Sequence, residues 1–144
     1  MPLRSLNPTS GELIRKYPEA SAEEVATVLA AARDAFAGWR RTPFADRAHP
    51  LKRAGELLRE RREDLARLMA LEMGKTLAQG RAEAEKCAWG CEYFAENAER
   101  FLAAEEVSTD AARSFVSFEP LGVILAVMPW NFPFWQVFRF AAPG

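Results

Sequence analysis

Residues 121–144 read LGVILAVMPWNFPFWQVFRFAAPG, and they carry the most specific information about the fold. Residues 123–128 are short, continuous and rich in Val and Ile, with Gly122 before them and Pro129 after them. That pattern is typical of a strand buried on both faces. Strands of this kind belong to parallel α/β sheets, and ligands of such sheets bind at the carboxyl ends of the strands. We therefore predict an α/β fold with residues 123–128 as a core strand.

Two prolines make the loop after this segment rigid. Met128 and Phe132 each precede a proline, which disfavours helical backbone at both positions, and Pro129 and Pro133 have restricted φ angles. A helix can therefore begin only at about Pro133, and Asn131 lies just ahead of it. Spacing leaves two interpretations of Asn131 open. It caps the helix, as Asn often does, or its amide serves a functional site.

The composition is that of an ordinary single-domain protein. The chain has 144 residues, 19 Lys and Arg against 20 Asp and Glu, and a net charge of -1. The basic residues alternate with acidic ones, which argues against nucleic-acid binding. Polar residues and prolines interrupt the apolar C-terminal stretch too often for a membrane span, and residues 1–10 lack the apolar core of a signal peptide. We expect neither a nucleic-acid nor a membrane partner, and a cytoplasmic location.

The two cysteines, Cys87 and Cys91, are four residues apart in a helical pattern. The single histidine, His49, is distant in sequence, so a zinc site would lack ligands and no metal is predicted. A disulfide between neighbours on one helix face would be strained. We expect both cysteines to be small, buried apolar residues in a reducing compartment.

The N-terminal segment predicts a hairpin followed by a helix. Residues 3–18 contain two extended segments around a turn at residues 7–11. Ser21 and Glu24 have the spacing of a capping box, so a helix should begin there and end near Gly38. The apolar residues of this helix recur at three-four spacing, which predicts one buried face.

Two longer helices should follow. Residues 44–74 predict one helix that ends at Gly74 in the left-handed conformation, with Pro50 either starting or kinking it. Residues 77–102 carry the most regular apolar period, and small residues in it suggest the close approach of a neighbour. Residues 103–112 form a polar connector, and residues 113–119 predict a strand. Some glutamates recur at helical spacing, namely Glu72, Glu83, Glu85, Glu92 and Glu96. No Glu-x-x-His pair accompanies them, so we do not predict a di-metal site.

Several stretches resemble the aldehyde dehydrogenase superfamily, most closely its succinate-semialdehyde dehydrogenase type. They are FEPLGVILAVMPWNFPFWQVFRFAAP at residues 118–143, NPTSGE at 7–12, FAGWR at 36–40 and EMGK at 72–75, in the family's order. PWNFP after an apolar strand is the most specific of them. The resemblance covers nearly the whole chain and the first part of the family.

The resemblance implies a fold and its divisions. Residues 1–112 would be the helical N-terminal part of a Rossmann-like cofactor-binding domain, and residues 113–121 the strand of an oligomerisation arm. Residues 122–144 would contain the first core strand of a parallel sheet, the PWNFP loop and the start of the next helix. It also implies a homo-oligomer, a dimer or a tetramer, since an exposed strand edge invites a second subunit.

The resemblance further implies a reaction. In this family a cysteine thiolate attacks a small aldehyde, hydride passes to NAD or NADP, and water activated by a glutamate releases the acid. The PWNFP asparagine, here Asn131, donates to the oxyanion. Arg139 matches an arginine that binds the substrate carboxylate in the succinate-semialdehyde enzymes, although a salt bridge elsewhere would also explain a lone cation among aromatic residues. The family lines its cofactor cleft with the residues that match Val127, Met128, Pro129 and Trp130.

The family's catalytic cysteine, general-base glutamate and cofactor glycine turn have no counterpart in these 144 residues. We therefore expect an N-terminal fragment that is inert on its own and leaves the choice between NAD and NADP open. The alternative is a non-enzymatic helical interaction module whose apolar C-terminus docks on a partner. PWNFP is a poor docking helix, which favours the fragment.

Overall fold

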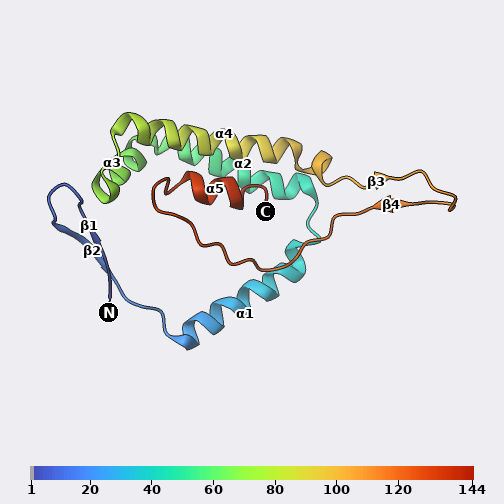
Figure 1. Cartoon of the computed structure of the whole chain (residues 1–144), viewed down its shortest axis with the longest axis horizontal. Coiled ribbons are helices and arrows are strands. Elements are labelled where there is room, and N and C mark those ends of the chain that lie inside the picture. The colour runs from blue at the N-terminus through green and yellow to red at the C-terminus, as the bar shows by residue number, and fades with distance from the viewer. Residues whose placement is uncertain (1) are drawn as a thin grey trace.

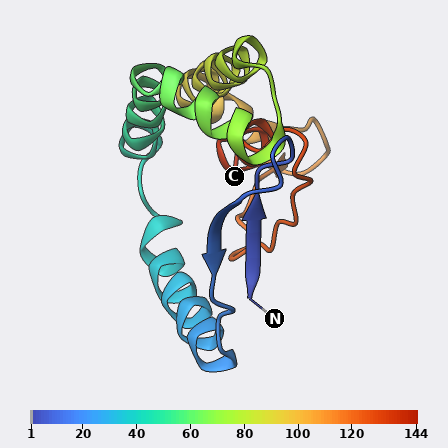
Figure 2. The same cartoon turned by 90° about the vertical axis from the view of Figure 1, so that its left-hand side faces the viewer.

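The computed structural model describes residues 2–144. In chain order the elements are β1 (Leu3–Leu6), β2 (Leu13–Tyr17), α1 (Ala22–Trp39), α2 (Phe44–Glu60), α3 (Arg62–Met73), α4 (Leu77–Phe101), β3 (Glu105–Glu106), β4 (Phe115–Val116) and α5 (Trp135–Ala141). Helices α2, α3 and α4 lie together, and α5 packs below α4 (Figure 1). Helix α1 and the β3–β4 hairpin extend away from this group (Figure 1), whereas the turn of the β1–β2 hairpin reaches the end of α3 (Figure 2), where a Cβ on Gly74 would lie 3.3 Å from Cγ of Pro8.

The core lies where α2, α3 and α5 meet α4. Small side chains on α4 let its neighbours approach closely, as its sequence predicts: a Cβ added at Gly80 would lie 2.8 Å from the Cα of Ala66 on α3. The buried apolar residues are Leu58, Ala66, Met69, Ala84, Cys87, Ala88, Cys91 and Ala142.

The N-terminal predictions are confirmed in their local structure. Strands β1 and β2 pair antiparallel, and α1 begins with the capping box, in which the Ser21 hydroxyl accepts from the N–H of Glu24 and the Glu24 carboxylate accepts from the N–H of Ser21. The hydrogen bond from the Ser21 N–H, and after it the interaction with the Ser21 hydroxyl, lowers the pKa of Glu24. The predicted buried face is wrong, since no residue of α1 is buried. The helix faces residues 121–123 across an open groove, and no layer of the described chain covers it.

The helix predicted over residues 44–74 is two helices. Arg61 leaves helical geometry, with φ of -98° and ψ of 13°, and separates α2 from α3. Pro50 lies inside α2. Gly74 ends α3 in the left-handed conformation, with φ of 72°, as predicted. The chain needs this break because α2 and α3 both pack against α4, at different points along it.

The core strand predicted at residues 123–128 is not a strand here. Residues 123–128 form no hydrogen-bonded ladder with another strand, and Leu125 and Val127 are 89% and 86% exposed. A strand is defined by bonds to a neighbouring strand, and no strand of the described residues runs beside this segment. Both sheets of the described chain are antiparallel hairpins.

The predicted strand at residues 113–119 is shorter than expected. Only Phe115 and Val116 pair, and their partners, Glu105 and Glu106, lie inside the predicted connector. The resulting β3–β4 hairpin projects far from the helices (Figure 1). No helix in residues 2–144 is both long and apolar enough to cross a bilayer.

Candidate functional site

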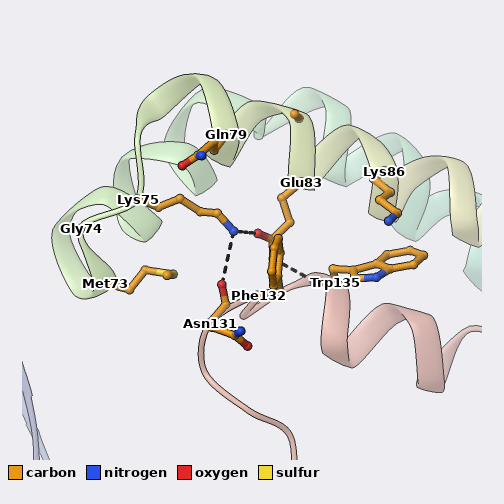
Figure 3. A pocket seen from close by; sticks show the side chains of 10 residues that line it. Met73, Gly74, Lys75, Gln79, Glu83, Lys86, Asn131, Phe132 and Trp135 are labelled. Atoms are coloured by element: carbon orange, nitrogen blue, oxygen red, sulfur yellow. Dashed lines mark hydrogen bonds and ion pairs between the residues drawn. The ribbon is translucent and has the colours of Figure 1, made fainter.

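A pocket of about 490 Å³ opens between the α3–α4 junction and the loop before α5. Gly74 ends α3, and the hydroxyl of Thr76 accepts from the N–H of Gln79 to begin α4, so Lys75 is the single residue between the two caps. Figure 3 shows Lys75 reaching from this junction toward the loop. The pocket is lined by Met73, Gly74, Lys75, Gln79, Ala82, Glu83, Lys86, Asn131, Phe132 and Trp135.

A buried ion pair forms the wall of this pocket. The ammonium of Lys75 contacts Oε2 of Glu83, and the two side chains are 7% and 3% exposed. With backbone included, Glu83 is 5% exposed and is the one charged residue among residues 2–144 that is buried as a whole. Charges are rarely buried unless they are paired and hydrogen-bonded, so this pair depends on both partners.

The second carboxylate oxygen of Glu83 fastens the start of α5. Oε1 accepts from the N–H of Phe134 at 2.9 Å and from the N–H of Trp135 at 3.0 Å. These are N–H groups that the first turn of a helix leaves without intrahelical partners. The N-cap position is Phe134, so the interpretation of Asn131 as the cap of this helix is wrong.

Lys75 holds the other side of the same loop. Its ammonium donates to the backbone carbonyl of Asn131 at 3.5 Å and lies 4.0 Å from the ring centroid of Phe132. The side-chain amide of Asn131 takes no hydrogen bond from residues 2–144. In Figure 3 this amide points away from the Lys75 ammonium. The loop is therefore anchored by its backbone, and the amide remains available to a ligand.

The four residues predicted to bind the cofactor lie outside this pocket. Val127 and Met128 end the unpaired segment, Pro129 and Trp130 are the first two residues of the PWNFP loop, and Trp130 is 76% exposed. Within the described chain, the backbone N–H and C=O groups of these residues take no hydrogen bond. They are adjacent to Asn131 in sequence but share no enclosed site with it.

Arg139 lies in the last turn of α5, away from the pocket lining. Its side chain is exposed and takes no ion pair within residues 2–144. Both interpretations of Arg139 stay predictions, because the expected salt bridge and the expected substrate carboxylate would each lie outside residues 2–144.

Neither cysteine is placed to act as a nucleophile. Cys87 and Cys91 are buried and free, as predicted, in the contact between α2 and α4. Burial, together with the Glu83 carboxylate, raises the pKa of Cys87 to about 12, and burial likewise raises the pKa of Cys91. Both thiols therefore remain protonated at neutral pH. Across residues 2–144, no three His, Cys, Asp or Glu side chains gather closely enough to hold a metal ion.

Sequence reasoning did not assign a role to Lys75 or Glu83. A signal for Glu83 was present, because it stands three residues after Gly80 and four before Cys87, on the buried face of α4. A carboxylate at such a position needs a cation or several N–H donors. No comparable signal in the sequence identifies Lys75 as the cation or Phe134 as the donor.

Comparisons with known proteins agree with this architecture. The model of the aldehyde dehydrogenase family matches residues 1–144. A probable NADP+ succinate-semialdehyde dehydrogenase of Synechocystis sp. is 50% identical over 144 residues, and succinate-semialdehyde dehydrogenase (NADP+) 1 of Mycobacterium tuberculosis is 47% identical over 147. All of this chain aligns with 32% of each of those two proteins.

The three-dimensional comparison gives the same result. The crystal structure of succinic semialdehyde dehydrogenase from Streptococcus pyogenes, in complex with NADP+, superposes with a TM-score of 0.93 at 30% identity. The match covers 97% of this chain and 31% of that one. The predicted fold class, the aldehyde dehydrogenase α/β fold, is thereby confirmed for the part that this chain spans, about a third of its relatives' length.

Proposed function

The chain belongs to the aldehyde dehydrogenase family, and from this we propose that it forms part of an NADP+-dependent enzyme that oxidises succinate semialdehyde to succinate. The relatives described above carry that activity in their names, and two of them specify NADP+ at 47–50% identity. These likenesses support the substrate and favour NADP over NAD.

One observation carries the role of this chain in the reaction. The amide of Asn131 is free of other hydrogen bonds, while its backbone is fastened through Lys75. A fixed neutral donor of this kind suits the negative oxygen that forms when a nucleophile adds to an aldehyde. Because such a donor need not reorganise during the reaction, the loss of one typically raises the barrier by about 3–4 kcal/mol.

The nucleophile and the general base are assigned to residues outside this chain. Cys87 and Cys91 are buried with raised pKa values, so neither thiol presents a thiolate to the pocket. By this proposal the 144 residues supply the oxyanion donor and are catalytically inert by themselves.

The segment before Asn131 fits one wall of a cofactor site. The unengaged N–H and C=O groups of Val127 and Met128 and the C=O of Pro129 can bond to a nucleotide, and the exposed indole of Trp130 offers a flat apolar surface. NADP+, when bound, supplies the acceptor for the hydride that leaves the aldehyde carbon. The role of these four residues is to bind and orient it.

The remaining assignments concern the substrate, the domains and the assembly. The free guanidinium of Arg139 suits the carboxylate of succinate semialdehyde, with which it can form a bidentate pair. Residues 1–112 and 122–144 are assigned to the cofactor-binding domain. Residues 113–121 are assigned to an arm that pairs with a second copy, since the β3–β4 hairpin projects with exposed edges. The reduced, buried cysteines suit a cytoplasmic protein.

The test uses the full-length enzyme of which, by this proposal, the 144 residues form part. NADPH formation is followed with succinate semialdehyde and with butanal, the uncharged aldehyde of the same carbon number. Asn131→Ala should lower kcat by about 100- to 1000-fold with little change in the KM for NADP+. Arg139→Met should raise the KM for succinate semialdehyde and leave that for butanal unchanged.

Either of two results would contradict the proposal. Turnover of the Asn131→Ala variant at the wild-type rate would exclude the oxyanion role. A wild-type protein that forms no NADPH with either aldehyde would exclude the activity and favour the interaction module instead.

A further inference from the structure

We propose that Lys75 and Glu83 are positioning residues that aim the Asn131 amide. The inference rests on the proposed function, because it concerns the donor assigned there. Neither residue has its charged group free to act on a substrate, since each is paired with the other inside the protein. Their remaining hydrogen bonds go to the backbone of one loop.

Glu83 fixes the end of the loop that leads into α5. Its Oε1 accepts from two consecutive N–H groups, those of Phe134 and Trp135, while Oε2 contacts Lys75. A single carboxylate thus joins the second turn of the packed helix α4 to the peptide groups just after the PWNFP motif. Because Glu83 is 3% exposed, water does not compete for these bonds.

Lys75 fixes the end of the loop that carries the donor. Its ammonium contacts the carbonyl of Asn131 and the face of the Phe132 ring at the same time. Pro133, whose φ angle is restricted by its ring, joins the two anchored halves. The backbone is therefore held from the Asn131 carbonyl onward, on the carboxyl side of the Asn131 Cα, which restricts the direction in which its side chain leaves the chain (Figure 3).

The anchoring begins at Asn131 and continues into the start of α5. Residues 123–128, immediately before the loop, take no comparable hydrogen bonds and are largely exposed. A donor displaced by about 1 Å can lose about 100-fold in rate, so a buried charge pair at this place has a direct kinetic consequence. A pair that served only the packing of α3 on α4 would not need bonds to the loop.

The experiment removes both charges together, in the full-length enzyme. Lys75→Met with Glu83→Met leaves no unpaired buried charge and removes the acceptor of the Phe134 and Trp135 N–H groups, and exchanging a buried ion pair for hydrophobic residues of similar volume is often tolerated by the fold. Arg81→Met is the matched control, since Arg81 lies on the same helix and pairs with Glu63 on the surface, away from the loop.

Two readouts are measured. The first is amide hydrogen exchange of peptides covering residues 129–135, which should become faster in the double variant and stay unchanged in Arg81→Met. The second is kcat with succinate semialdehyde, which should fall by about 10- to 100-fold in the double variant, with the KM for NADP+ unchanged. In an Asn131→Ala background the double substitution should lower kcat no further, because a residue that acts through Asn131 has nothing left to position.

Each other outcome overturns the proposal. Unchanged exchange would show that the pair does not anchor the loop. Equal losses of kcat with and without Asn131 would show that the pair acts elsewhere. If the double variant does not fold, Glu83→Asp keeps the charge pair but shortens the reach to Phe134 and Trp135, and wild-type exchange and kcat in that variant would be equally decisive.

Failure of the proposed function is distinguishable from failure of the positioning role. A wild-type protein without activity would refute the oxidation of succinate semialdehyde. The exchange measurement would then still decide whether Lys75 and Glu83 anchor the loop.

Discussion

Replacing Gly80 by alanine tests how α3 and α4 are held together. The added Cβ would lie 2.8 Å from the Cα of Ala66 and 3.0 Å from its Cβ. Both are backbone or backbone-attached atoms that no side-chain rotation can move. The substitution must therefore push α3 away from α4, and it must also shift the junction that carries Lys75.

The magnitude follows from two opposing effects. Overpacking in a well-packed contact costs about 1–3 kcal/mol, and alanine gains about 0.5–1 kcal/mol over glycine inside a helix. For Gly80→Ala we expect a net loss of about 1–2 kcal/mol in the free energy of unfolding. Gly90, on the same helix, is the matched control. A Cβ there would meet the Trp135 ring at an ordinary 3.5 Å, so Gly90→Ala should stabilise the protein by about 0.5–1 kcal/mol.

Urea-induced unfolding followed by circular dichroism measures both variants under the same conditions. The two glycine substitutions should change the free energy of unfolding with opposite signs. Gly80→Ala should also lower kcat, because the displaced junction moves Lys75 relative to the loop that it anchors. A Gly80→Ala protein at least as stable as the wild type would refute the close approach of α3 to α4.

Two further predictions concern titration and charge. Because burial raises the folded-state pKa of Cys87 to about 12, its contribution to stability is fully present below the unfolded thiol pKa of about 8.5 and is lost as the pH rises toward 12. The free energy of unfolding, measured in urea, should thus decline above about pH 8.5, less steeply in Cys87→Ala; a flat profile would argue against the buried thiol. Arg59 bridges Glu85 and Glu92 between α2 and α4 and lowers the pKa of Glu92, so that stabilisation is present above the unfolded glutamate pKa of about 4.3 and fades as the pH falls. Arg59→Met should cost about 1 kcal/mol at low salt and less at high salt, and a salt-independent loss would point to packing instead of charge.

Local features of this protein were predictable because they depend on residues close together in the chain. The capping box at Ser21 and Glu24, the left-handed end at Gly74 and the long helix before the β3–β4 hairpin all appear as their residue types indicate. The prolines of PWNFP likewise predict a rigid loop at Asn131. Steric limits on φ and hydrogen bonds within a few residues determine such features, and they operate before any tertiary contact forms.

Features that need a partner from elsewhere in the chain were not predictable from pattern. Residues 123–128 have the composition of a core strand, but a strand exists only where another strand bonds to it, and here the segment stays unpaired. The apolar stripe of α1 remains exposed for the same kind of reason, since a pattern specifies a face and not what covers it.

The candidate site also combines a feature that nearby residues determine with features that depend on distant ones. The sequence alone, by its PWNFP motif, singled out Asn131 and the resemblance that gives it a role. Only the tertiary structure decided that Asn131 is not a helix cap and that Lys75 and Glu83 fasten its loop. Glu83 and Phe134 are 51 residues apart, and they meet because α5 packs on α4. The burial that this packing creates is what makes a paired carboxylate necessary at that point.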